Sequence, residues 1–71
     1  MIHSEEATIE ALISIGVDPT KASFGVTHPK SGVTYEIAHY YGEKNGIKLF
    51  RVYADGKLAL RAEEQIKAIF A

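Results

Sequence analysis

The fold is decided by residues 43–58, which read EKNGIKLFRVYADGKL. Two dipeptides in this stretch, Asn45-Gly46 and Asp55-Gly56, are typical of two-residue hairpin turns, because both of their positions tolerate positive φ. Residues 47–54, between the two turns, are rich in the apolar and aromatic side chains that strands favour. The stretch therefore predicts two successive hairpins, with neighbouring strands antiparallel.

Further strands are expected on both sides of this stretch. Residues 33–41 alternate Val, Tyr, Ile, His and Tyr with other residues, as a long half-buried strand does. The turn signal His28-Pro29-Lys30-Ser31-Gly32 precedes them, and before it Phe24 and Val26 alternate with smaller residues. Residues 57–60 read either as a short strand or as the start of the last helix. The strand is favoured because Leu60 falls off the apolar stripe of that helix.

Helices are expected at the two ends of the sequence. Residues 4–15 begin with Ser4 as a possible N-cap and two glutamates where the helix dipole favours negative charge. The expected apolar face of this helix consists of Ile9, Leu12 and Ile13. Asp18-Pro19 then predicts a single helical turn over residues 19–22, or a plain turn. The last helix is expected over residues 61–70, with Ala62, Ile66, Ile69 and Phe70 on one face.

The predicted fold class is therefore α+β, in the order α-β-β-β-α, as one domain over residues 1–71. A small antiparallel meander carries two helices on one face. A two-residue turn at Asn45-Gly46 fixes the register, and the paired residues are expected to be Lys44–Ile47, Glu43–Lys48, Tyr41–Phe50, His39–Val52 and Ile37–Ala54. The expected core face carries Tyr35, Ile37, Tyr41, Phe50, Val52 and Ala54. A three-residue loop would instead shift the register by one and group Tyr41, Leu49, Arg51 and Tyr53.

The other sheet face is the candidate binding surface. It is expected to hold Glu36, Ala38, Tyr40, Leu49, Arg51 and Tyr53, joined by Leu58 and Leu60 if the last strand pairs. Two helices cover one face of a small sheet, and an exposed face rich in Tyr, Arg and Leu is typical of protein interaction hot spots. The candidate binding residues are Tyr40, Arg51, Tyr53, Leu49, Glu36 and Lys48. Two other interpretations are cross-strand pairs that only stiffen the sheet, and self-association.

Composition narrows the class of protein. Hydrophobic residues make up 46% and charged residues 24%, as in globular proteins. A net charge of −1 and a pI near 6.3 argue against nucleic acid and against anionic membranes. The absence of cysteine excludes disulfides and thiolate chemistry. The first six residues lack the order of a secretory signal, so we expect a cytoplasmic protein.

No enzyme chemistry is expected. The histidines, His3, His28 and His39, fall at separate places, whereas a metal site needs three or four convergent ligands. The acidic residues lie in first helical turns or off the apolar stripes, and the serines have no nucleophile-elbow context. No Gly-rich phosphate-binding loop precedes a helix. We therefore expect no metal, no cofactor and no catalytic residue.

The order α-β-β-β-α over about 70 residues resembles the double-stranded-RNA-binding domain, in topology and length. That resemblance implies phosphate contacts from a basic cluster at the start of the second helix. Residues 61–65, Arg-Ala-Glu-Glu-Gln, are acidic there instead. The sheet and final helix are also similar to small DNA-binding arms of integrases. A nucleic-acid interface would use Lys44, Lys48, Arg51 and Lys57 along the second hairpin.

The expected function is that of a small non-enzymatic protein-binding module, such as an adaptor or an inhibitor of a larger complex. Inhibitors encoded by phages and mobile elements are often of this size. The expected partner is another protein, reached through the sheet face with Tyr40, Arg51 and Tyr53. The alternatives are a nucleic-acid-binding module and a homodimer that closes its open sheet face or its edge strand.

Overall fold

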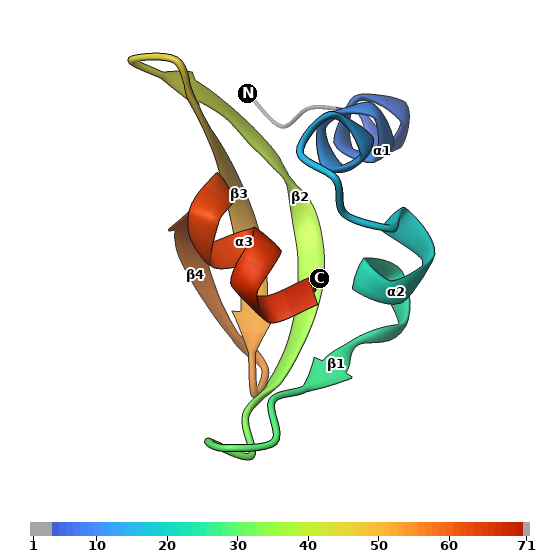
Figure 1. Cartoon of the computed structure of the whole chain (residues 1–71), viewed down its shortest axis with the longest axis vertical. Helices are drawn as coiled ribbons and strands as arrows, with labels where there is room; N and C mark the ends of the chain where they lie inside the picture. Colours follow the sequence, from blue (N-terminus) through green and yellow to red (C-terminus); the bar gives the residue numbers. More distant parts are fainter. Residues whose placement is uncertain (1–3, 71) are drawn as a thin grey trace.

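The computed structural model describes residues 4–70. The elements are α1 (Glu5–Ser14), α2 (Pro19–Phe24), β1 (Val26–Thr27), β2 (Thr34–Lys44), β3 (Ile47–Ala54), β4 (Lys57–Ala62) and α3 (Glu63–Phe70). The sheet has the order β1-β2-β3-β4, and each neighbouring pair is antiparallel (Figure 1). The predicted α+β meander is confirmed. The strand reading of residues 57–60 is also confirmed, and because β4 continues to Ala62, the last helix begins two residues later than predicted.

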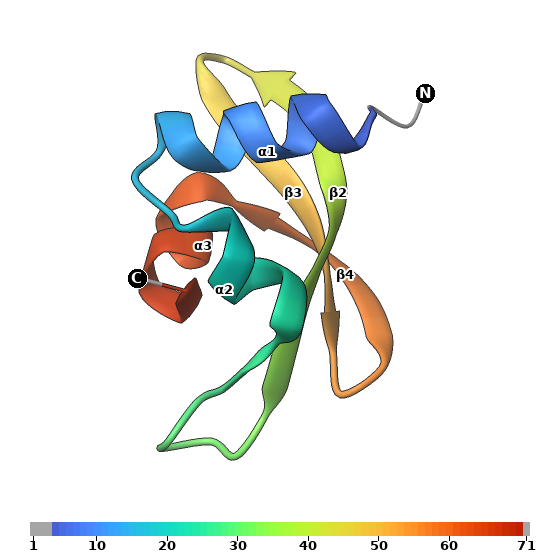
Figure 2. The same ribbon diagram turned by 90° about the vertical axis from the view of Figure 1, so that its right-hand side faces the viewer.

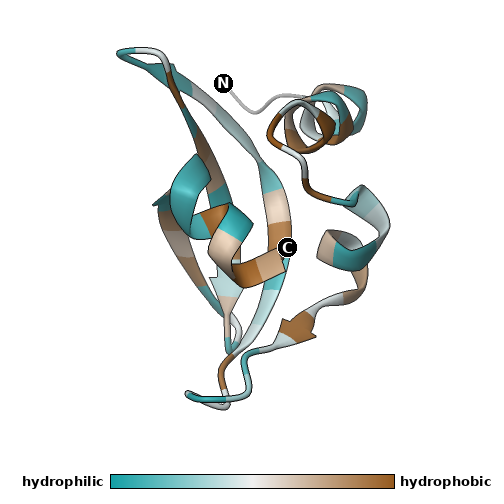
Figure 3. Cartoon of the chain, viewed as in Figure 1, coloured by the Kyte–Doolittle hydropathy of each residue, from teal (hydrophilic) through white to brown (hydrophobic). Residues whose placement is uncertain are grey.

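The three helices and the sheet enclose one core. Helix α3 contacts β3 and β4, while α1 and α2 lie along β2 (Figures 1 and 2). The buried hydrophobic residues of the described chain are Ala11, Leu12, Val17, Ala22, Phe50, Val52, Ile66 and Phe70. Figure 3 shows hydrophobic residues at intervals along β3 and β4 as well as on α1 and α3. The core side of the sheet is called the helix face below.

Local signals explain where the helices begin. The Ser4 side chain accepts a hydrogen bond from the Ala7 N–H, and the Asp18 side chain accepts one from the Thr20 N–H, so both predicted caps are confirmed. Helix α2 is longer than predicted and ends with Phe24. Phe24 is therefore not in a strand, and its side chain is 85% exposed.

The apolar face expected for the first helix is only partly correct. Helix α1 buries Thr8, Ala11 and Leu12, while Ile9 is 38% and Ile13 61% exposed. Hydrogen bonds of Thr8 explain why α1 is rotated relative to the predicted orientation. The Thr8 hydroxyl accepts a hydrogen bond from the Tyr40 N–H and donates to the Ser4 carbonyl, which turns the Thr8 side of α1 toward β2. Hydrophobic spacing alone could not reveal this contact.

Both predicted hairpin turns are confirmed. Asn45 and Gly46 have φ of 52° and 79°, and Asp55 and Gly56 have φ of 50° and 82°. These are the paired positive values that a two-residue turn requires. The second turn also reaches β2, because Asp55 donates its N–H to the Thr34 carbonyl and accepts the Thr34 N–H on Oδ1, both at 2.9 Å.

The predicted register is correct next to the first turn and wrong beyond it. Lys44 pairs with Ile47 and Glu43 with Lys48 as expected. Two irregularities in β2 then shift the pairing, one between Tyr40 and Gly42 and one between Ile37 and His39. The observed pairs are Tyr40–Phe50, His39–Arg51, Ile37–Val52 and Tyr35–Ala54. Each irregularity places an extra residue on β2, as a β-bulge does, and re-phases the side chains that follow.

The bulge beside Gly42 exchanges the faces of two tyrosines. Tyr40 turns to the helix face opposite Phe50, and Tyr41 turns to the other face. Gly42 has φ of 150°, a value that L side chains rarely adopt. The three-residue loop considered above does not form. Its grouping of Tyr41, Leu49, Arg51 and Tyr53 does occur, but the bulge produces it.

We predict that Gly42→Ala destabilises the protein by about 1–3 kcal/mol, the usual cost of holding an L residue in a sparsely populated backbone region. An added Cβ would meet no heavy atom within 4 Å, so the cost comes from the backbone and not from a clash. Urea unfolding measures it. A D-alanine at position 42 is the matched control, because its mirror-image preference suits positive φ. Equal stability of the two variants would contradict the assigned bulge.

Candidate functional site

The candidate site is the sheet face that no helix of the described chain covers, called the open face here. The register assigns it Glu36, His39 and Tyr41 from β2, Ile47, Leu49, Arg51 and Tyr53 from β3, and Leu58 and Leu60 from β4. Five of these residues, Tyr41, Ile47, Tyr53, Leu58 and Leu60, are large hydrophobic residues that are each 42–48% exposed. Isolated exposed hydrophobics are ordinary in a monomer, but several on neighbouring strands mark an interaction surface.

Arg51 lies at the centre of the open face. His39 faces it on β2 and Leu60 faces it on β4, and its guanidinium carbon lies 5.1 Å from the centroid of the Tyr41 ring. The ion pairs within residues 4–70 are Lys48–Glu43 and Lys67–Glu64, so Arg51 pairs with no carboxylate there. A shallow hollow of about 280 Å³ lies beside it, lined by Arg51, Leu58, Ala59 and Leu60. The centre of the open face thus places a cation next to a hollow whose other lining residues are apolar.

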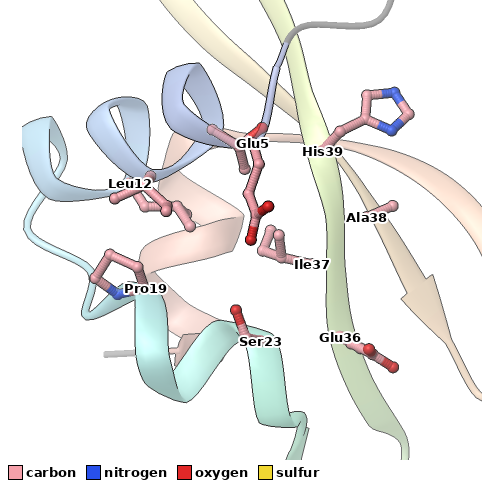
Figure 4. Close-up of a pocket in the computed structure, with 10 residues that line it drawn as sticks. Glu5, Leu12, Pro19, Ser23, Glu36, Ile37, Ala38 and His39 are labelled. Atoms are coloured by element: carbon pink, nitrogen blue, oxygen red, sulfur yellow. The ribbon is translucent and has the colours of Figure 1, made fainter.

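Four of the six predicted binding residues lie on this face. They are Arg51, Tyr53, Leu49 and Glu36. Figure 4 shows the Glu36 and His39 side chains pointing away from α1 and α2. The prediction that pairs His39 with Val52 of the core face is therefore wrong, because the bulge between Tyr40 and Gly42 moves His39 opposite Arg51.

The placement of Tyr40 on the binding face is also wrong. Its ring centroid lies 5.2 Å from that of Phe50 at an interplanar angle of 49°, and its N–H donates to Thr8 at 2.9 Å. Burial, followed by the nearby carboxylates of Glu43 and Glu63, raises the pKa of the Tyr40 phenol above its ordinary value. Tyr40 therefore belongs to the packing between β2, β3 and α1.

Lys48 is the second predicted residue that lies elsewhere. It occupies the helix face, where its Nζ lies 3.8 Å from the carboxylate of Glu43, its predicted cross-strand partner. Its backbone N–H donates to the Glu63 carboxylate at 2.8 Å, which ties β3 to the first residue of α3. Lys48 thus has a structural role in the described chain.

Sequence reasoning missed Tyr41, His39 and Ile47 as members of the open face. The available signal was Gly42, since a glycine inside a strand pattern often marks a bulge. A bulge there would have moved Tyr41 out of the core face.

The four cations proposed for nucleic acid do not form one stripe. The register places Lys44 and Arg51 on the open face and Lys48 and Lys57 on the helix face. The position at which the double-stranded-RNA-binding domain is basic is occupied here by Glu63 and Glu64, in the first turn of α3. This geometry gives a backbone-tracking phosphate interface little support.

Within residues 4–70, no group of three or more His, Asp or Glu side chains could hold a metal ion. His3 lies outside the described residues. None of the helices in the described part has the length and apolar character needed to cross a membrane.

Comparison of the chain with protein-family models, with curated proteins and with solved structures finds no match. The geometry and physical chemistry of the open face are therefore the guide to its function.

The face exchange of Tyr40 and Tyr41 predicts opposite effects of alanine at adjacent positions. Tyr40→Ala is expected to destabilise the protein by about 2 kcal/mol, because it removes an aromatic ring from the partly buried packing against Phe50. Tyr41→Ala is expected to change stability by less than about 1 kcal/mol, since an exposed cation–π contact contributes little. Chemical unfolding of both variants measures the difference, and the reverse order would contradict the assigned faces.

Proposed function

We propose that this chain is a small non-enzymatic protein-binding module whose open face docks on another protein. The observation that supports it best is the cluster of five exposed hydrophobic residues around Arg51, on a face without a helix in the described chain. Leaving that much apolar surface in water forgoes a stabilisation of about 25 cal/mol per Å². A partner that covers the face would recover it.

The side chains of the open face are of the kinds that concentrate binding energy. Tyrosine and arginine are enriched among interface hot spots, especially where apolar neighbours exclude water around them. Here Tyr41 lies beside Arg51 on β2, Tyr53 lies two residues from Arg51 on β3, and Leu58 and Leu60 of β4 supply the apolar surroundings. A stable interface buries about 800 Å² on each partner, a modest part of the 4689 Å² accessible surface of this molecule.

The charge of the face favours an acidic group on the partner. Arg51 has no carboxylate partner within residues 4–70, and Lys44 is a second cation on this face, which also carries the carboxylate of Glu36. A carboxylate buried against Arg51 would gain charge-assisted hydrogen bonds. We therefore propose a partner surface that is apolar with an aspartate or glutamate near its centre.

A module of this kind would act as an adaptor or as an inhibitor that covers the working surface of a larger complex. Inhibitors of this size from phages and mobile elements belong to the same class. Residence in the cytoplasm stays a prediction that rests on the cysteine-free composition.

A homodimer is a second candidate, favoured by one observation. Glu36 and Arg51 lie on the same face, so a two-fold pairing of open faces could place the Glu36 of one copy near the Arg51 of the other. Sedimentation across a wide concentration range tests this pairing, and a monomer at all concentrations would exclude it.

The test of the main proposal is affinity capture from host lysate with and without nuclease, followed by binding measurements on the captured protein. Arg51→Glu is expected to weaken binding at least tenfold, equivalent to about 1.4 kcal/mol, because it reverses the charge at the centre of the face. Lys30→Glu makes the same charge change at an exposed position of the 28–32 turn and is expected to bind like the wild type.

Three outcomes would contradict the proposal. Equal loss of binding in the two variants would indicate a general electrostatic effect. Unchanged binding in a folded Arg51→Glu variant would remove the open face from the interface. Capture that disappears with nuclease would support the nucleic-acid alternative.

A further inference from the structure

A second surface lies on the opposite side of β2, where a groove of about 410 Å³ separates that strand from α1 and α2. Glu5 and Ile9 of α1, Ser23 of α2, and Ile37 and Ala38 of β2 are among its lining residues. Its volume is in the range of ligand-binding clefts. The groove borders the open face, because Glu36 and His39, which belong to that face, also line it.

The groove runs along a section of β2 that has no strand beside it. Strand β1 pairs only with Thr34 and Tyr35. Farther along, the Tyr40 N–H leaves the sheet on the same side and is bound by Thr8 of α1. Between these two points no strand of the described chain pairs with this edge, so β2 is an edge strand there.

The unpaired backbone N–H and C=O groups in this section of β2 point into the groove, because backbone groups alternate in direction along a strand. The backbone groups of Tyr35 point away from β3 and pair with Val26. The backbone N–H of Tyr40 also points away from β3 and donates to Thr8. Ile37 is two residues from Tyr35, so its backbone groups point away from β3 as well. The bulge between Ile37 and His39 adds one residue, which accounts for the odd number of residues from Ile37 to Tyr40. An exposed edge of this kind is a template for an added strand.

The side chains around this edge are a mixture of apolar and polar groups, and each helix contributes an acceptor. Figure 4 shows the Glu5 carboxylate pointing into the groove from α1, the Ser23 hydroxyl pointing into it from α2, and Ile37 projecting between them. The other titratable residues of the lining are Glu36 and His39, whose side chains point away from α1 and α2, and the lining contains no lysine and no arginine. Glu5 forms no ion pair within residues 4–70. The groove is therefore suited to a cationic occupant with an apolar stem.

We propose that this groove binds an extended peptide segment that adds a strand to the β2 edge at Ile37 and places a lysine or arginine side chain against Glu5. Strand addition supplies main-chain hydrogen bonds, and side-chain sites such as Glu5 supply specificity. A segment of three residues spans about 10 Å. The inference does not depend on the proposed function of the open face.

The test uses peptide libraries of seven residues, random except for a central lysine, arginine, glutamate or alanine, titrated into isotopically labelled protein. The lysine and arginine libraries are expected to shift the amide resonances of Ile37 and Ala38 and to slow hydrogen exchange at Ile37. Glu5→Lys is expected to weaken this binding at least about tenfold and to favour the glutamate library. Glu6→Lys is the matched control, since it reverses an adjacent exposed charge in the same helical turn outside the groove lining.

Several results would overturn the inference. If no library shifts Ile37 or Ala38 in the folded protein, the edge does not accept a strand. Equal loss of binding in Glu5→Lys and Glu6→Lys would assign the effect to net charge. If butylamine alone binds as tightly as the peptides, the groove is a small-cation site and strand addition is wrong.

Discussion

The structure depends on the irregular pairing of β2, which has to serve a core on one side and a solvent face on the other. A regular strand would place Tyr41 opposite Phe50, but the bulge at Gly42 places Tyr40 there. Tyr40 then packs on Phe50 and donates its N–H to Thr8, which positions α1 along the strand. Tyr41 is left on the open face, where its ring meets the Arg51 guanidinium. The core contact and the composition of the open face thus have the same origin.

The sequence predicted the parts of the fold that depend on local chemistry. Asn45-Gly46 and Asp55-Gly56 form the expected turns, and Ser4 and Asp18 cap the expected helices. These features follow from a few adjacent residues, whose φ preferences and hydrogen-bonding groups can be read directly.

The parts that could not be predicted depend on contacts between distant residues. The prediction assigned Tyr40 and His39 to sheet faces by the alternation of side chains along a regular strand. Each bulge reverses the face of the residues that follow it. The rotation of α1 depends on a hydrogen bond from Tyr40 to Thr8, 32 residues apart. For the candidate site, Leu49, Arg51 and Tyr53 lie on β3, where no residue is inserted, and their face was predicted correctly. Glu36 lies beyond both bulges of β2, whose shifts cancel, so its face was also predicted correctly, whereas that of Tyr41 was not. The two proposed surfaces both adjoin these irregular positions, and they differ in charge.

The measurement that tests this account most directly is a nuclear Overhauser experiment on the rings of the two adjacent tyrosines. The account predicts cross-peaks between the Tyr40 and Phe50 rings, whose centroids are 5.2 Å apart, and between the Tyr41 ring and the Arg51 side chain. Cross-peaks from Tyr41 to Phe50, with Tyr40 next to Arg51, would show an unbulged hairpin. That result would contradict both the core packing and the open face described here.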